Sequence, residues 1–226
     1  MPNMNALVIA AHPDDEVLGA GGTIASLAAR GWHVSILILA EGISLRHAGM
    51  SLKAARRNCR TAASRLGVED VQFGGFSADN KLLADGEQRP VVATIERALT
   101  ESEPSLVLTH HPGDIHADHR MVAHSVSYAT RLLGLGSVSR VLHFEVLSST
   151  EQQPGLVAPF TPNVFVDVTG FIDAKCDALE VYSYETFDVI HPRSVNGIRA
   201  LANYRGVQLG VREAEAFALG RELVRF

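Results

Sequence analysis

Two short segments of the chain hold most of the side chains that could do chemistry. The first is His12-Pro13-Asp14-Asp15-Glu16, which follows an apolar run directly. The second spans residues 109–119 and contains four histidines and two aspartates: His110, His111, Asp114, His116, Asp118 and His119. Imidazoles and carboxylates bind divalent metal ions and transfer protons in general acid–base catalysis. The two segments therefore indicate a metal site, a proton-transfer site, or both.

The chain places both segments at the ends of expected strands. Because Pro13 disfavours helical geometry at the preceding residue, His12 is expected in an extended conformation at the carboxyl end of a strand over Ala6–Ala11. The second segment follows a strand candidate at Leu106–Thr109. In a doubly wound sheet the fourth strand lies beside the first, and ligands bind where their carboxyl ends meet. The two segments are therefore expected to converge.

Three of these residues form a candidate ligand set for a catalytic metal ion. His12, Asp15 and His119 offer two nitrogens and one oxygen, which leaves a coordination position open for water. For the carboxylates alone, capping of a following helix is an equally good interpretation, but it does not explain His12. For His110 and His111, a structural role and a role as metal ligand both stay open. Four further histidines are expected to be structural: His33, His47, His124 and His143.

Strand-like runs alternate with helix-period segments over most of the chain. Most strand candidates are continuously apolar, as in parallel strands buried on both faces: 6–11, 34–40, 71–73, 106–109, 141–144 and 164–168. Apolar stripes at helical spacing separate them at 17–27, 52–66, 92–99 and 122–133. The expected fold is α/β, a Rossmann-like, doubly wound and mostly parallel sheet with helices on both faces.

The length of 226 residues favours one domain spanning 1–226, at about 100–200 residues per domain. Residues 1–145 are expected to form the Rossmann-like core. After residue 145 the pattern loosens, and residues 146–226 are expected to extend the sheet and cap the substrate side. A late helix is expected near Phe171–Tyr182, and Glu215 is expected on a terminal helix with a structural role.

Composition disfavours several classes of function. The net charge is −5 and no dense basic run occurs, so binding to nucleic acid is disfavoured. The two cysteines, Cys59 and Cys176, form neither a C-x-x-C pair nor a disulfide framework. No stretch approaches the roughly 20 apolar residues of a membrane span, and no basic leader precedes the first apolar run. We expect a cytoplasmic protein without a membrane partner.

A dinucleotide site is the obvious competitor for the first segment, since Gly19-Ala20-Gly21-Gly22 follows a strand. The third glycine of the fingerprint belongs at position 24, which is Ile24. The carboxylates of the preceding turn would also repel a pyrophosphate. A nucleotide cofactor is therefore disfavoured.

The motifs His12-Pro13-Asp14-Asp15-Glu16 and His116-Ala117-Asp118-His119 together resemble the PIG-L/LmbE-like family of zinc-dependent N-acetylglucosamine deacetylases. Arg205-Gly206 and Ala214-Glu215-Ala216-Phe217 resemble the carboxyl-terminal pattern of its bacterial members. The resemblance implies the PIG-L/LmbE-like fold. It also implies an amidohydrolase for linear amides that removes the N-acetyl group from an N-acetylglucosamine-type amino sugar or glycoconjugate by metal-activated water.

The resemblance also implies roles for individual residues. His12, Asp15 and His119 would hold one Zn²⁺ per chain, with Fe²⁺ or Co²⁺ as possible substitutes. Asp14 would act as general base, and His116, oriented by Asp118, as the cationic partner of the reaction. The implied partners are a small-molecule amino sugar and further copies of the chain, as a trimer or hexamer.

The substrate-binding candidates follow the second strand or lie in a late polar stretch: Arg46, Arg56, Tyr184, His191 and Arg193. For the arginines, a solvated helix face is the alternative.

Two other functions share parts of the pattern of candidate site residues. A mononuclear iron oxygenase also uses two histidines and one carboxylate, and a non-catalytic sugar-binding member would keep the fold without the reaction.

Overall fold

The computed structural model describes residues 3–41, 50–76, 83–131, 137–153, 155, 158–188 and 190–224. Their strands are β1 (Asn5–Ala10), β2 (His33–Ala40), β3 (Asp70–Phe76), β4 (Leu106–His110), β5 (Arg140–Phe144), β6 (Val164–Asp167) and β7 (Ala214–Glu222). Their helices are α1 (Asp15–Ala29), α2 (Leu52–Arg65), α3 (Gln88–Ser102), α4 (Ala117–Ala129), α5 (Ile172–Glu180) and α6 (Val195–Val207). Short 3-10 turns lie at Leu83–Asp85 and Thr150–Gln152.

The strands form one seven-stranded sheet in the order β3-β2-β1-β4-β5-β7-β6. The first five strands pair in parallel, whereas β7 pairs antiparallel with both β5 and β6. β4 lies directly beside β1, with Ile9 opposite Thr109. The expected α/β doubly wound sheet is confirmed, and the carboxyl ends of β1 and β4 are neighbours.

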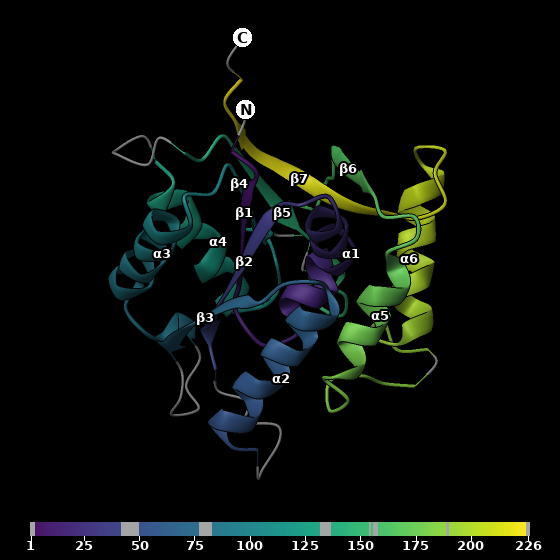
Figure 1. Ribbon diagram of the computed structural model, residues 1–226, viewed down its shortest axis with the longest axis horizontal. Coiled ribbons are helices and arrows are strands. Elements are labelled where there is room, and N and C mark those ends of the chain that lie inside the picture. Colours follow the sequence, from purple (N-terminus) through teal and green to yellow (C-terminus); the bar gives the residue numbers. More distant parts are fainter. Residues whose placement is uncertain are drawn as a thin grey trace.

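Helices cover both faces of the sheet (Figure 1). α3 and α4 lie on one face, and α1, α2 and α5 lie on the other, with α6 beside α5 and β7. Within β1, Leu7 and Ile9 pack into the core under α3 and α4, while Val8 and Ala10 pack into the core under α1. All four side chains are fully buried. Burial on both faces explains why this strand is continuously apolar rather than alternating.

The carboxyl-terminal segment differs from the expectation in one element. The expected late helix is α5, but Glu215 lies on β7 and not on a terminal helix. The β7 residues from Ala214 to Phe217 are all buried, so both faces of the strand are covered here and the alternation that marks a strand is lost. Short buried strands of this kind cannot be told from helix by periodicity.

β7 is tied to α1 at a break in that helix. Ala20 has non-helical φ and ψ of −144° and 15°. The Glu215 carboxylate accepts the backbone N–H groups of Gly22 at 3.0 Å and Thr23 at 2.7 Å. Lys175 Nζ donates to the Leu18 carbonyl at 2.8 Å and to Glu215 at 2.6 Å. This buried pair replaces hydrogen bonds that the break removes, and so fixes the first turns of α1.

Close packing explains the glycines near the break. A Cβ on Gly19 would lie 2.3 Å from the Phe144 ring, and one on Gly21 would lie 2.9 Å from Lys175. These positions need glycine because the Phe144 and Lys175 side chains occupy the space that a Cβ would take. Packing within the protein is enough to explain both glycines.

We expect Glu215→Gln to destabilise the fold strongly, because it leaves the Lys175 ammonium buried without a countercharge. Breaking a buried ion pair typically costs about 3–5 kcal/mol of unfolding free energy. Urea unfolding followed by circular dichroism measures the loss. Arg199→Gln is the matched control, since its partner Asp173 is 78% exposed, and an exposed pair contributes about 0–1 kcal/mol. An equal loss of unfolding free energy in the two variants would contradict a stabilising role for the buried Lys175–Glu215 ion pair.

Candidate active site

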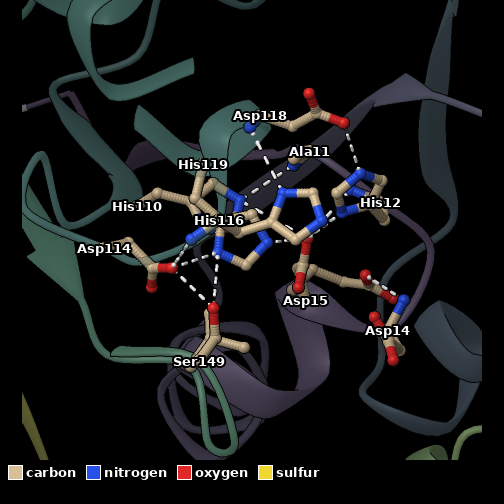
Figure 2. A network of polar contacts seen from close by, with 12 residues as sticks. Ala11, His12, Asp14, Asp15, His110, Asp114, His116, Asp118, His119 and Ser149 are labelled. Atoms are coloured by element: carbon tan, nitrogen blue, oxygen red, sulfur yellow. Dashed lines mark hydrogen bonds and ion pairs between the residues drawn. The ribbon is translucent and has the colours of Figure 1, made fainter. Parts of the chain in front are cut away.

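The two polar segments meet at the carboxyl ends of β1 and β4 (Figure 2). His12 follows β1, Asp15 opens α1, and His119 lies in the first turn of α4. Asp15 Oδ2 is 3.2 Å from Nδ1 of His12 and 3.2 Å from Nε2 of His119. It also accepts the backbone N–H of His12 at 2.9 Å. One carboxylate oxygen thus joins residues from both segments.

The donor spacing fits a bound metal ion. Two ligand atoms at about 2.0–2.1 Å from a tetrahedral zinc ion stand about 3.3 Å apart, close to both separations at Asp15. Two overlapping groups in the described part of the chain bring their ligand atoms within 4.8 Å of one another. One group is His12, His116 and His119, and the other is Asp15, His110 and His119.

Hydrogen bonds decide which of these donors are available. His110 Nε2 accepts the backbone N–H of Ala11 at 2.8 Å, so its lone pair is already used. His116 Nδ1 accepts the backbone N–H of Asp118 at 3.2 Å, so a neutral His116 ring carries its proton on Nε2. His12 and His119 each keep a ring nitrogen 3.2 Å from Asp15 Oδ2.

Asp114 orients His119, a role that sequence reasoning missed. Its carboxylate lies 3.2 Å from His119 Nδ1 and accepts the hydroxyls of Ser149 at 2.5 Å and Thr150 at 2.6 Å. It also accepts the backbone N–H of His116 at 2.8 Å. A proton shared on Nδ1 leaves Nε2 of His119 directed at Asp15. The only signal in the sequence is the place of Asp114 inside the histidine-rich segment.

The Asp118 carboxylate contacts His12 and not His116. Its Oδ2 lies 2.9 Å from His12 Nε2, and its Oδ1 accepts the backbone N–H of Ala84 at 2.8 Å. Only the backbone N–H of Asp118 reaches the His116 ring. The expectation that Asp118 orients His116 is therefore corrected: its side chain turns toward β1, where it holds His12.

Burial and neighbouring charges set the protonation of the imidazoles. Burial alone would lower the pKa of His12, but hydrogen bonds to Asp118 and Asp15 raise this pKa to about 10. Burial lowers the pKa of His116 to about 4, helped by positive charge on His12 and His119. Without a bound cation His116 is thus neutral at pH 7. Its cationic role in a metal-loaded site stays a prediction. Its Nε2–H remains a hydrogen-bond donor.

The two adjacent aspartates differ in opposite directions. Burial would raise the pKa of Asp15, but the imidazoles of His119 and His110 lower it well below its ordinary value. Burial raises the pKa of Asp14 well above its ordinary value, although Arg193 opposes the shift. Asp15 is therefore held as a carboxylate, while Asp14 has the raised proton affinity that a general base near neutral pH needs.

Asp14 has an unusual backbone conformation. Its φ of 106° and ψ of −30° place it at positive φ, where a residue with a Cβ pays about 1–3 kcal/mol. Its Oδ2 contacts Arg193 Nη1 at 2.9 Å, and Arg193 also contacts Glu185 at 3.2 Å. Its backbone N–H donates to Glu16 Oε2 at 3.1 Å.

Arg193 is the substrate-binding candidate that the described contacts bring to Asp14. His191 Nδ1 accepts the backbone N–H of Arg193 at 3.1 Å, and its ring lies tilted against the Phe187 ring. Arg56 and Tyr184 make other contacts, and Arg46 cannot be compared. Arg56 pairs through two nitrogens with Glu41 and lies over the Phe73 ring, Tyr184 packs edge-on against Tyr182, and Arg46 lies outside the described residues.

Two of the remaining histidines pack next to the site. His110 is fully buried and stacks on His119 with ring centroids 4.0 Å apart. His143, expected to be structural, contacts the His110 carbonyl through Nδ1 at 2.7 Å.

None of the helices in the described part of the chain combines the length and the apolar character that a membrane span requires.

Comparison with known proteins identifies relatives that share the two motifs' part of the chain. The family model PIG-L, described as GlcNAc-PI de-N-acetylase, matches residues 7–130, which include both motifs. The chain is 28% identical over 219 residues to diacetylchitobiose deacetylase of Thermococcus kodakarensis, covering 92% of this chain and 80% of that protein. It is 27% identical over 229 residues to 1D-myo-inositol 2-acetamido-2-deoxy-alpha-D-glucopyranoside deacetylase of Mycobacteroides abscessus, covering 81% and 82%.

A solved structure shares the fold across almost the whole chain. GalB, the 4-carboxy-2-hydroxymuconate hydratase of Pseudomonas putida KT2440, superposes with a TM-score of 0.78 at 23% identity, covering 98% of each chain. At this identity the likeness shows the fold alone. The family model spans both motifs and more than half of the chain. The chain therefore belongs to the PIG-L family.

Proposed function

We propose that this protein is a zinc-dependent hydrolase that removes the N-acetyl group from an N-acetylglucosamine-type amino sugar or glycoconjugate. The observation that carries the proposal is the convergence of His12, Asp15 and His119 next to Asp14, a buried carboxylate that is not part of the ligand set. Support also comes from the relatives, which are deacetylases of acetylated amino sugars.

His12, Asp15 and His119 would hold the metal ion, with Asp118 and Asp114 fixing the two imidazoles. A zinc ion held there would supply a water molecule of pKa about 7 and a positive charge near the acetyl carbonyl. The donor set also accepts Fe²⁺ or Co²⁺.

Asp14 takes the proton from the water that attacks the acetyl carbonyl carbon, because it is a buried carboxylate outside the ligand set and burial raises its pKa. The His116 ring, whose Nδ1 accepts the backbone N–H of Asp118, donates its Nε2–H to the carbonyl oxygen as negative charge develops there. Asp14 then gives that proton to the amide nitrogen as the C–N bond breaks. The products are acetate and a primary amine on the sugar.

The two alternative functions lose support. A mononuclear iron oxygenase gains nothing from a second carboxylate with a raised pKa beside the ligand set. A sugar-binding protein without activity has no need of Asp14 in a strained conformation. The substrate class, the metal and the reaction are tested together by amine release.

The purified, zinc-loaded protein is expected to release free primary amine from at least one member of a panel of N-acetylglucosaminides. Removing the metal with a chelator should abolish the release, and added zinc should restore it, because the ligand set is empty after chelation. Fluorescamine labelling of the amine measures the rate. Release that persists in protein shown to be free of metal would overturn the proposed mechanism.

Asp14→Asn is expected to keep the metal and to lose about 10²–10⁴-fold in kcat, because the amide cannot take the proton. His12→Ala and His119→Ala should lose both metal and activity. Atomic absorption gives the metal content, and amine release gives kcat. His124→Ala is the control, since this histidine is exposed on α4. Full activity in metal-loaded Asp14→Asn would remove Asp14 as the base.

Asp114→Asn is expected to weaken zinc binding by about 10–100-fold, since a ligand's outer hydrogen-bond partner sets its orientation and basicity. Competition with a chromophoric chelator measures the dissociation constant. Asp173→Asn, which changes a largely exposed aspartate, should leave it unchanged. An unaltered dissociation constant in Asp114→Asn would show that His119 needs no carboxylate partner.

We also propose a single domain over 1–226, a cytoplasmic setting and a homo-oligomer, as a trimer or hexamer. The resemblance of the two motifs supports the oligomer, and the composition supports the other two. Sedimentation velocity of the purified protein tests the oligomeric state.

A further inference from the structure

The side chain of Glu16 folds back over the preceding turn. Its Oε2 accepts the backbone N–H of Asp14 at 3.1 Å, and its Oε1 accepts the Tyr182 hydroxyl at 2.7 Å. Both side chains are buried, Glu16 at 1% exposure and Tyr182 at 0%. A buried carboxylate must find hydrogen-bond donors, and these two contacts supply one donor to each oxygen.

Tyr182 is held by the core and not by the site. Its ring is among the largest fully buried side chains and lies in the core that includes α1, α2 and α5. Its backbone N–H donates to the Leu179 carbonyl at 2.8 Å, which ties it to the end of α5. The position of its hydroxyl is therefore set by packing. Through this hydroxyl the core fixes where the Glu16 carboxylate lies.

The Asp14 backbone is held at both of its polar groups. Its carbonyl accepts the N–H groups of Val17 at 3.0 Å and Leu18 at 2.9 Å, which start α1. Its N–H is directed to Glu16. An N-cap residue normally has β-region φ and ψ, whereas Asp14 has a φ of 106°. Since φ sets the direction of the side chain relative to the N–H, the bond to Glu16 selects this conformation.

We propose that Glu16 and Tyr182 are positioning residues for Asp14: their hydrogen-bonded pair holds the Asp14 backbone at positive φ and keeps its carboxylate beside Arg193 and next to Asp15. This inference rests on the proposed function, in which Asp14 is the general base. Neither Glu16 nor Tyr182 contacts His12 or His119 among the described hydrogen bonds and ion pairs. We therefore expect their effect on the reaction to act through Asp14.

The sharpest test compares two substitutions at position 16. Glu16→Gln keeps an oxygen that accepts the Asp14 N–H, whereas Glu16→Met keeps the length but offers no oxygen acceptor. A misplaced catalytic group costs about 100-fold in rate, so Glu16→Met is expected to lose about that factor in kcat. Glu16→Gln should stay within about tenfold of the wild type. KM and zinc content should change little in either variant, because substrate and metal contacts remain.

Tyr182→Phe tests the second member of the pair by removing one hydroxyl. We expect a loss of kcat in the same direction but smaller, about tenfold, because the Glu16 carboxylate keeps its bond to Asp14. Tyr128→Phe is the matched control, since this tyrosine on α4 is 51% exposed. Its kcat should equal that of the wild type.

A crystal structure of Glu16→Met gives a readout independent of activity. The inference expects Asp14 to leave positive φ and its carboxylate to lose the Arg193 contact. An Asp14 that keeps its conformation would overturn it. Equal kcat in the Gln and Met variants at equal thermal stability, or a loss of stability alone, would also overturn it. If the wild type releases no amine from any sugar, the proposed function fails, whereas the Asp14 conformation in the variant still decides the inference.

Discussion

The parallel pairing of β1 with β4 is the contact on which the site depends. It sets two segments about 100 residues apart in sequence side by side, because Ala6 lies opposite Leu106 and Ile9 opposite Thr109. Asp15 Oδ2 then reaches His12 from its own segment and His119 from the other. A shift of the pairing by one residue would turn every side chain of a strand to the opposite face. The cores on both faces of the sheet prevent such a shift, so hydrophobic packing far from the polar residues determines their geometry.

Charge balance is the second condition that the site meets. Several carboxylates and imidazoles are buried together, and each buried carboxylate has a partner that can carry positive charge or donate a hydrogen bond. Asp15 and Asp114 contact His119, Asp118 contacts His12, and Asp14 contacts Arg193. Burial without such partners would be very unfavourable. Burial and these contacts shift the pKa values of two sequence neighbours in opposite directions: the pKa of Asp14 is raised and that of Asp15 is lowered.

Sequence reasoning predicted the sheet, the neighbouring strands and the convergence of both motifs, because apolar runs and chain order constrain them strongly. It did not predict contacts that depend on side-chain rotamers. Spacing placed Asp118 near His116, but the side chain of Asp118 turns to His12. Contacts between distant segments were also missed: Arg193 meets Asp14 across 179 positions, and Glu215 meets Gly22 across 193. No local pattern carries that information. The first residues of β7, Ala214–Phe217, are all buried, so they show no alternation of buried and exposed side chains. In the sheet this strand lies between two others.

The position of β7 bears on the order in which the chain acquires its structure during synthesis. The break in α1 is completed by Glu215, so the first helix to leave the ribosome lacks two hydrogen-bond acceptors until nearly the whole chain has been made. β1 to β5 can pair earlier, because their partners are closer in sequence, but contacts between distant segments form late. The turn that carries Asp14 and Asp15 precedes this break directly. A nascent chain therefore holds the turn that carries Asp14 and Asp15 in an unfinished form until the last strand enters the sheet.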